Sequence, residues 1–223
     1  LIEASICSAE KIYVVGMPRA DYFFKNIDAQ KKHILLLMPF WKPPQILKTK
    51  ISFDQEQYSK NITDVIVDFA QKNPQENIVI KTKMFDKTDN SLDLIIQQKK
   101  IKNIILKKGG SSKNLIKDAK VVVGFQSTGL IEALILRKPI IVPLFNLNLN
   151  QTFQECTLKL DEIAYYAKDR ISMIRYLEDI CKEKIDFPKV ASIKIDNTIN
   201  HYIGNSDGNS SDKLLNVFNE ILK

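Results

Sequence analysis

The sequence predicts an α/β fold in which a doubly wound parallel sheet is covered by helices on both faces and followed by C-terminal helices. Two observations support this fold class. Short runs of β-branched residues and leucine are apolar throughout, as expected for strands that are buried on both faces. Longer segments with helical spacing separate these runs, so strand and helix signals alternate from about residue 31 onward.

Five of the apolar runs are predicted to be strands of one Rossmann-like sheet, and a sixth run precedes them. The five are Ile34–Leu37, Ile78–Ile80, Ile104–Leu106, Val121–Val123 and Ile140–Val142. The run Ile12–Val15 is also predicted to be a strand, although Gly16-Met17-Pro18-Arg19 ends it and the polar stretch Lys25–Lys32 follows. We therefore assign residues 1–30 to a junction with a preceding domain.

Four segments between the predicted strands have helical spacing. They are Gln55–Gln71, Ser91–Gln98, Ser112–Ala119 and Thr128–Leu136. After Pro143 the alternation stops, and Asp169–Lys182 and Asp212–Leu222 are predicted to be further helices, the second preceded by a turn over residues 204–211. The expected organisation is a Rossmann-like domain over residues 31–185 and a helical tail over residues 186–223.

Composition fits a folded protein, because 44% of the 223 residues are hydrophobic and 26% are charged. No apolar run approaches the roughly 18 residues that span a bilayer, and no signal peptide is expected from the first residues. Cys7, Cys156 and Cys181 are far apart, which favours a reducing cytoplasm over a disulfide framework. His33 and His201 do not have metal-ligand spacing, so we expect no metal site.

The formal net charge of +7 suits an anionic partner such as a nucleotide or a phospholipid surface. Lysines are densest between residues 99 and 117. We prefer a solvated lysine-rich face over a binding surface as the explanation of this density. No aromatic residue is interleaved with these lysines to stack on bases, so we do not expect nucleic acid as a partner.

The strongest candidate for a binding site is the turn that follows Val121–Val123, because parallel α/β sheets bind ligands outside the carboxyl ends of their strands. Gly124 would let a ligand or a neighbouring backbone come close. Ser127 or Thr128 is expected to cap the next helix, whose free N–H groups would favour a phosphate. Gly129 would remove a side chain that could obstruct the ligand.

Glu132 is the only charged residue between Val121 and Leu136. A buried carboxylate is costly unless its hydrogen bonds are satisfied. Glu132 shares a helix face with Thr128, and helical side chains lean toward the N-terminus, so we expect its carboxylate to point at the opening of the turn. There a ribose diol could donate to it; the alternative is that it accepts hydrogen bonds from backbone N–H groups of a neighbouring loop.

Three other turns are expected to line the same cleft. Pro39 and Trp41 follow the strand Ile34–Leu37, although Trp41 could equally be a packing aromatic. Lys81 and Lys83 follow the next strand, where they would face donor phosphates or simply lie on the surface. Gly109-Gly110 follows Leu106 and could touch a base or a phosphate.

Several segments resemble motifs of GT-B-type glycosyltransferases of surface polysaccharide synthesis, and among them the CDP-glycerol glycerophosphotransferase and capsule-synthesis relatives. Gly16–Asp21 is similar to their Gly-x-Pro-Arg-x-Asp, which lies between two domains, and His33–Lys42 is similar to Ile-Leu-Tyr-x-Pro-Thr-Trp-Arg. Gly124–Leu134, followed by Lys138-Pro139, resembles a Ser-x-x-x-x-Glu-Ala stretch and a Lys-Pro strand start. Asp207-Gly208 is similar to an Asp-Gly before the terminal helix.

This resemblance implies the C-terminal half of a GT-B fold, with an acceptor-binding N-terminal domain missing. It implies that Ser127, Thr128 and Gly129 bind the diphosphate of a nucleotide-sugar and that Glu132 binds its ribose. Lys83 stands where glycerophosphotransferases have a catalytic histidine, and Gly124-Phe125-Gln126 replaces their Asp-Tyr-Ser. Transfer of a sugar to a surface polysaccharide or glycolipid acceptor is therefore preferred over transfer of glycerophosphate.

The expected enzyme is a cytoplasmic glycosyltransferase that needs no metal or other cofactor, with contact to the inner face of a membrane left open. Alternatives are a glycerophosphotransferase, a sugar-nucleotide epimerase or a non-catalytic nucleotide-binding module. Lys81 and Lys83 are the candidate catalytic residues. The candidate nucleotide-sugar-binding residues are Gly124, Gln126, Ser127, Thr128, Gly129, Glu132, Pro39, Trp41, Gly109 and Gly110.

Overall fold

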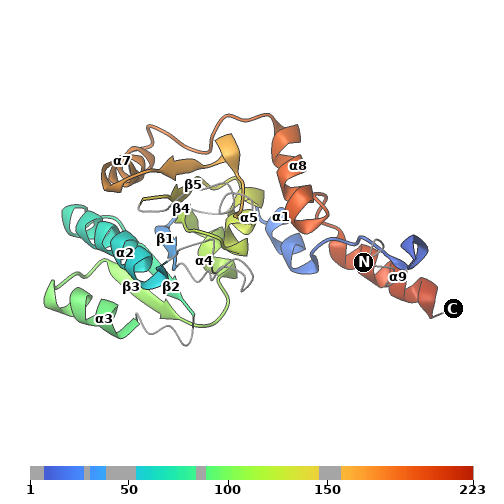
Figure 1. Cartoon of the computed structure of the whole chain (residues 1–223), viewed down its shortest axis with the longest axis horizontal. Coiled ribbons are helices and arrows are strands. Elements are labelled where there is room, and N and C mark those ends of the chain that lie inside the picture. Colours follow the sequence, from blue (N-terminus) through green and yellow to red (C-terminus); the bar gives the residue numbers. More distant parts are fainter. Residues whose placement is uncertain (1–7, 28–30, 39–53, 84–88, 146–156, 223) are drawn as a thin grey trace.

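Six parallel strands form a single sheet at the centre of the molecule (Figure 1). The computed structural model describes residues 8–27, 31–38, 54–83, 89–145 and 157–222. The strand order is β3-β2-β1-β4-β5-β6, which is the order of dinucleotide-binding α/β folds. The strands are β1 (His33–Leu37), β2 (Ile78–Thr82), β3 (Ile104–Lys108), β4 (Ala119–Val123), β5 (Ile140–Pro143) and β6 (Tyr165–Ala167).

The two central strands, β1 and β4, are apolar because both of their faces are covered. Ile34 pairs with Ile78 of β2 on one side and with Val121 of β4 on the other, and all three side chains are completely buried. The edge strand β3 differs, since its Ile105 is 48% exposed. The continuous apolar runs thus identified the sheet, and the predicted doubly wound parallel fold is confirmed.

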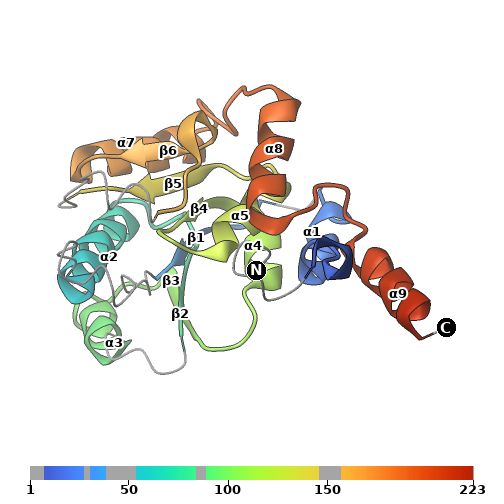
Figure 2. The same cartoon turned by 45° about the vertical axis from the view of Figure 1, so that its right-hand side comes forward.

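Helices cover both faces of the sheet (Figure 2). On one face lie α2 (Gln55–Lys72), α3 (Asp89–Gln98) and α7 (Arg170–Cys181). On the other face lie α4 (Lys113–Lys117) and α5 (Thr128–Ile135). No helix among the described residues is both long enough and apolar enough to cross a membrane.

Polar side chains fix where three of these helices begin. Asp54 accepts a hydrogen bond from the backbone N–H of Gln57 at the start of α2. Ser127 accepts one from the N–H of Gly129 at the start of α5, which confirms the predicted cap. Asp169 and Ser172 form a reciprocal capping box at the start of α7.

Three expectations about the flanking regions are corrected. Ile12–Val15 is not a strand, because its side chains are not buried between helices; Val14 is 74% exposed. The alternation also continues after Pro143, through η4 (Asp161–Ile163) and the short strand β6. The tail predicted to be helical over residues 186–223 contains α8 (Ser192–Ile203), which was not predicted as a separate helix, because its buried apolar stripe consists of only three isoleucines, Ile195, Ile199 and Ile203.

The two ends of the described chain pack together beside α5. The N-terminal segment contains η1 (Ala9–Lys11), η2 (Pro18–Ala20) and α1 (Asp21–Phe24), and the C-terminal segment ends with α9 (Ser210–Ile221). Asp21 caps α9, since its two carboxylate oxygens accept from the N–H groups of Ser210 and Ser211 at 3.0 and 2.7 Å. Figures 1 and 2 show α9 extending away from the sheet and α8 standing next to α5.

Candidate functional site

The strand order reverses its direction between the neighbouring strands β1 and β4. From β1 the chain winds outward through β2 to β3, and from β4 it winds the opposite way through β5 to β6. Ligands of open α/β sheets bind at such a reversal point. The turn of residues 124–127 follows β4 at this point, whereas the predicted site residues Pro39 and Trp41 lie outside the described residues.

The β4–α5 turn is held tightly by its own residues. A Cβ on Gly124 would lie 3.1 Å from Leu130 Cδ2 and 3.4 Å from Leu37 Cβ, so Gly124 allows the helix to approach the sheet. Gln126 has a left-handed φ of 49°, and its side-chain oxygen accepts a hydrogen bond from the N–H of Leu158 at 2.9 Å. Gly124 and Gln126 therefore shape the turn and join it to the chain beyond β5.

Gly129 has a packing role that differs from the predicted one. A Cβ at this position would lie 2.6 Å from Leu37 Cδ1 and 3.2 Å from Ile116 Cδ1. Core side chains therefore fill the space that was expected to admit a ligand, and this reason for Gly129 was wrong. Thr128, by contrast, is exposed at the first position of α5.

Glu132 is 2% exposed and is paired with an arginine. Its Oε1 accepts a hydrogen bond from the guanidinium of Arg19, which comes from η2. Its Oε2 is buried and has no hydrogen-bond partner among the described residues. Burial raises the pKa of the Glu132 carboxyl, and the positive charges of Arg19 and Lys113 oppose this rise. Arg19 therefore satisfies Oε1, where the sequence predicted a ribose or the backbone of a neighbouring loop as the partner. Oε2 lacks a hydrogen-bond partner within the described residues.

Two exposed cations contribute positive charge at this carboxylate. The side chain of Arg19 is 61% exposed, and Lys113 is the exposed first residue of α4. The Lys113 ammonium lies 3.6 Å from the centroid of the Tyr22 ring, and the Tyr22 hydroxyl donates to Asn114 Oδ1 at 2.9 Å. We name Arg19, Tyr22, Lys113 and Glu132 the α5 charge cluster. The expected site did not include its first three members, although Arg19 lies in the Gly16–Asp21 motif.

The other predicted residues lie at the carboxyl ends of β2 and β3. Lys81 donates a hydrogen bond to the carbonyl of Thr82 at 2.8 Å, and Lys83 is exposed. The N–H of Gly109 donates to the same carbonyl at 3.1 Å, and Gly110 has a φ of +71° with open space where a Cβ would stand. Because β1 separates β2 from β4, Lys81 and Lys83 share an edge of the sheet with Ser127 but are roughly 10 Å away across the strands, and Gly109 and Gly110, which follow β3, are about one strand further away.

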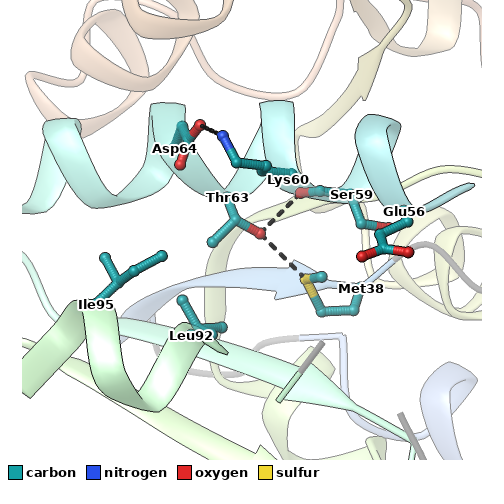
Figure 3. A pocket seen from close by; sticks show the side chains of 8 residues that line it. All are labelled: Met38, Glu56, Ser59, Lys60, Thr63, Asp64, Leu92 and Ile95. Carbon is teal, nitrogen blue, oxygen red and sulfur yellow. Dashed lines mark hydrogen bonds and ion pairs between the residues drawn. The ribbon is translucent and has the colours of Figure 1, made fainter. Parts of the chain in front are cut away.

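A cavity of about 260 Å³ lies between α2 and α3 (Figure 3). Thr63 donates to the carbonyl of Ser59 at 2.8 Å and contacts the sulfur of Met38, while Leu92 and Ile95 form an apolar wall. None of the predicted site residues is among the described residues that line it. Its volume is also below the roughly 300–1,000 Å³ of typical ligand pockets. The α5 charge cluster is therefore the better candidate site.

Comparison with known proteins identifies the class of fold. Residues 40–145 match the family described as capsule polysaccharide biosynthesis protein. No curated protein sequence matches the chain. The wall teichoic acid polymerase TagF, in a structure soaked with CDPG, is 14% identical with a TM-score of 0.56, over 96% of this chain and 51% of that one.

A putative UDP-N-acetylglucosamine 2-epimerase from Listeria monocytogenes is 11% identical with a TM-score of 0.50, over 96% of this chain and 54% of that one. The chain thus spans about half the length of these solved structures. These similarities confirm the Rossmann-like α/β architecture of a GT-B fold and the predicted resemblance to proteins of surface polysaccharide synthesis.

Proposed function

We propose that this chain is the donor-binding domain of a glycosyltransferase that moves a sugar from a nucleotide-sugar to a surface polysaccharide or glycolipid acceptor. The observation that carries the proposal is Glu132, a buried carboxylate on the helix that follows the reversal point of the sheet, one of whose oxygens has no hydrogen-bond partner within the described part of the chain. The capsule polysaccharide match and the CDPG soak of the structurally similar TagF support this substrate class.

The diphosphate and the ribose of the nucleotide would contact different turns of α5. The first turn of a helix offers unpaired N–H groups and a partial positive charge, which favour a diphosphate beside the exposed Thr128. Glu132 lies four residues further on and would accept hydrogen bonds from the ribose hydroxyls. A carboxylate acceptor of this kind binds a diol through charge-assisted hydrogen bonds.

The reaction requires charge compensation at the departing nucleotide. The bond between the anomeric carbon and the phosphate oxygen breaks, and its electron pair leaves with the nucleoside diphosphate. The acceptor hydroxyl forms the new bond and loses its proton to a base that we assign to a separate acceptor-binding domain. Lys81, Lys83 and the α5 N-terminus would stabilise the leaving diphosphate without an obligatory metal ion. We therefore expect this chain alone to be inactive.

Glycerophosphate transfer is a second candidate, because the structural similarity to TagF is as strong as any other reported above. The exposed Lys83 argues against it, since the resemblance places a catalytic histidine there. A preference for CDP-glycerol over every nucleotide-sugar would favour this second candidate. We place either reaction in the cytoplasm, in keeping with the sparse and scattered cysteines.

Calorimetry with UDP-, GDP-, CDP- and CMP-sugars tests the donor site. Glu132→Ala is expected to weaken binding of the preferred donor by about 1–3 kcal/mol, the cost of losing hydrogen bonds to a charged group. Glu76→Ala is the matched control, because Glu76 is also buried and ion-paired, with Lys120 at 2.6 Å. Glu76 precedes β2 and therefore lies at the amino ends of the strands, away from the proposed donor site. Equal affinities for wild type and Glu132→Ala would remove the basis of the proposal.

A further inference from the structure

Arg19 blocks the carboxylate that the proposed function assigns to ribose. Its guanidinium binds Glu132 Oε1, and Oε2 is closed to solvent. A sugar hydroxyl cannot reach either oxygen as the side chains stand. Donor binding at Glu132 therefore requires the ion pair to open, and the question is where the guanidinium goes.

We propose that Arg19 is itself a donor-binding residue, which transfers its guanidinium from Glu132 to the diphosphate as the ribose hydroxyls take over the carboxylate. This inference rests on the proposed function and names the ligand class as a nucleoside diphosphate. The exchange leaves neither group without hydrogen-bond partners, because the guanidinium gains two phosphates and the carboxylate gains two hydroxyl donors.

The position of Arg19 favours this exchange. Glu132 follows Thr128 by four residues, which is a rise of about 6 Å along the helix axis. The guanidinium at Glu132 is therefore about one helical turn from the first residue of α5, where the diphosphate is proposed to bind. Arginine suits this task, since its planar fork of N–H donors matches phosphate oxygens.

The charged groups around Arg19 favour the binding of an anion. Lys113 adds a second positive charge from α4, and the Tyr22 ring supports its ammonium. The nearest other carboxylate of the N-terminal segment, Asp21, is turned toward the N–H groups of Ser210 and Ser211. Within the described residues, two exposed cations thus oppose one buried carboxylate in the α5 charge cluster.

The backbone that carries Arg19 is fixed, so the exchange needs only a side-chain rotation. Pro18 precedes Arg19 at the start of η2 and restricts the backbone there. Asp21 follows it and is hydrogen-bonded to α9. Once the ion pair with Glu132 opens, rotation of the exposed Arg19 side chain between these anchors would bring the guanidinium toward the helix start.

Titration calorimetry with UDP, GDP, CDP and the matching nucleoside monophosphates tests this role. Arg19→Ala is expected to weaken the diphosphate that wild type binds best by about 10- to 100-fold, and the monophosphate much less. Arg19→Lys should restore part of the loss because it keeps the charge but not the fork. Arg137→Ala is the matched control, since Arg137 pairs with Asp196 beyond the far end of the same helix.

A double-mutant cycle separates phosphate binding from a structural role. In the Glu132→Gln background no buried charge is left uncompensated, so the protein should tolerate Arg19→Ala. A phosphate contact predicts that Arg19→Ala still weakens diphosphate binding in that background. No further loss there, or equal losses for monophosphate and diphosphate, would overturn the inference.

The outcomes for the two proposals are distinct. If Glu132→Ala weakens binding and Arg19→Ala does not, the donor site stands and the role of Arg19 is wrong. If wild type binds none of the nucleotides or nucleotide-sugars, both proposals fail.

Discussion

At the scale of single residues, Glu132 has features that oppose stability and fit the proposed binding role. It is 2% exposed, one of its oxygens has no hydrogen-bond partner among the residues that the structure describes, and burial raises its pKa. Unsatisfied buried groups are rare in proteins and are concentrated where a ligand completes the hydrogen bonds. The position therefore favours a carboxylate for binding and an uncharged side chain for folding.

Glu132→Gln is expected to make the folded protein more stable at neutral pH while weakening nucleotide binding. A carboxyl with a raised pKa in the folded state contributes stability below its ordinary pKa of 4.5, and this contribution is lost as pH rises through the folded value. The free energy of unfolding of the wild type should therefore fall relative to that of the variant as pH rises from about 4.5 through the raised pKa of the folded state. Urea unfolding at a series of pH values from about 4 to about 8 measures the difference.

The control for this titration is Glu76→Gln, which removes a buried carboxylate that pairs with Lys120. A stability difference between wild type and Glu132→Gln that does not change with pH would contradict the expectation. So would a wild-type protein that gains relative stability as pH rises.

The sequence identified Glu132 but not its counterion. A lone carboxylate in an apolar helix is visible in one short stretch of sequence, because its desolvation cost follows from the neighbouring residues. Arg19 lies 113 residues away in a segment that was assigned to a junction. Nothing local to Arg19 indicates that contact, since it arises from packing of the N-terminal segment against α5.

At the scale of elements, each strand that was predicted correctly contains a continuous apolar run, including the partly exposed edge strand β3. β1, β2, β4 and β5 are apolar runs between two helical layers, and all were predicted. The three-residue strand β6 carries two tyrosines that are only half-buried, so no continuous apolar run marks it. Ile12–Val15 has the composition of a strand, but composition does not supply a partner strand.

Gly129→Ala tests the packing of α5 against the sheet. Alanine normally favours a helix over glycine, but here the new Cβ would lie 2.6 Å from Leu37 Cδ1. We expect a loss of about 1–3 kcal/mol in the free energy of unfolding, as for overpacked cores. Denaturant unfolding measures this loss, and Leu37→Val should recover part of it in the double variant. A gain in stability from Gly129→Ala alone would show that the helix is not tightly packed there.

At the scale of the whole molecule, the site depends on both ends of the described chain. The Gly16–Asp21 motif supplies Arg19, and Asp21 joins that motif to α9, a contact between residues 189 positions apart. The Asp207-Gly208 motif lies at the same junction, where a Cβ on Gly208 would lie 2.7 Å from Phe24 Cβ. The motifs were recognisable in the sequence, but their meeting depends on long-range packing.

Gly16→Ala tests whether this junction positions Arg19. Gly16 has a φ of +86°, and a Cβ there would lie 2.5 Å from both Asn205 Cβ and Ser210 Oγ. The substitution should push the N-terminal segment away from α9, so that Arg19 no longer reaches Glu132. We expect faster hydrogen exchange in α9, a stability loss of about 1–3 kcal/mol and weaker diphosphate binding.

The control is Ile193→Ala on α8, whose side chain is 67% exposed and away from this junction. Hydrogen-exchange mass spectrometry and calorimetry on the same protein samples report both effects. Faster hydrogen exchange in α9 with unchanged diphosphate affinity would show that the position of Arg19 does not depend on the contact between the N-terminal segment and α9. Coupled losses would mean that a contact between the two ends of the described chain, far from the sheet, sets the strength of donor binding.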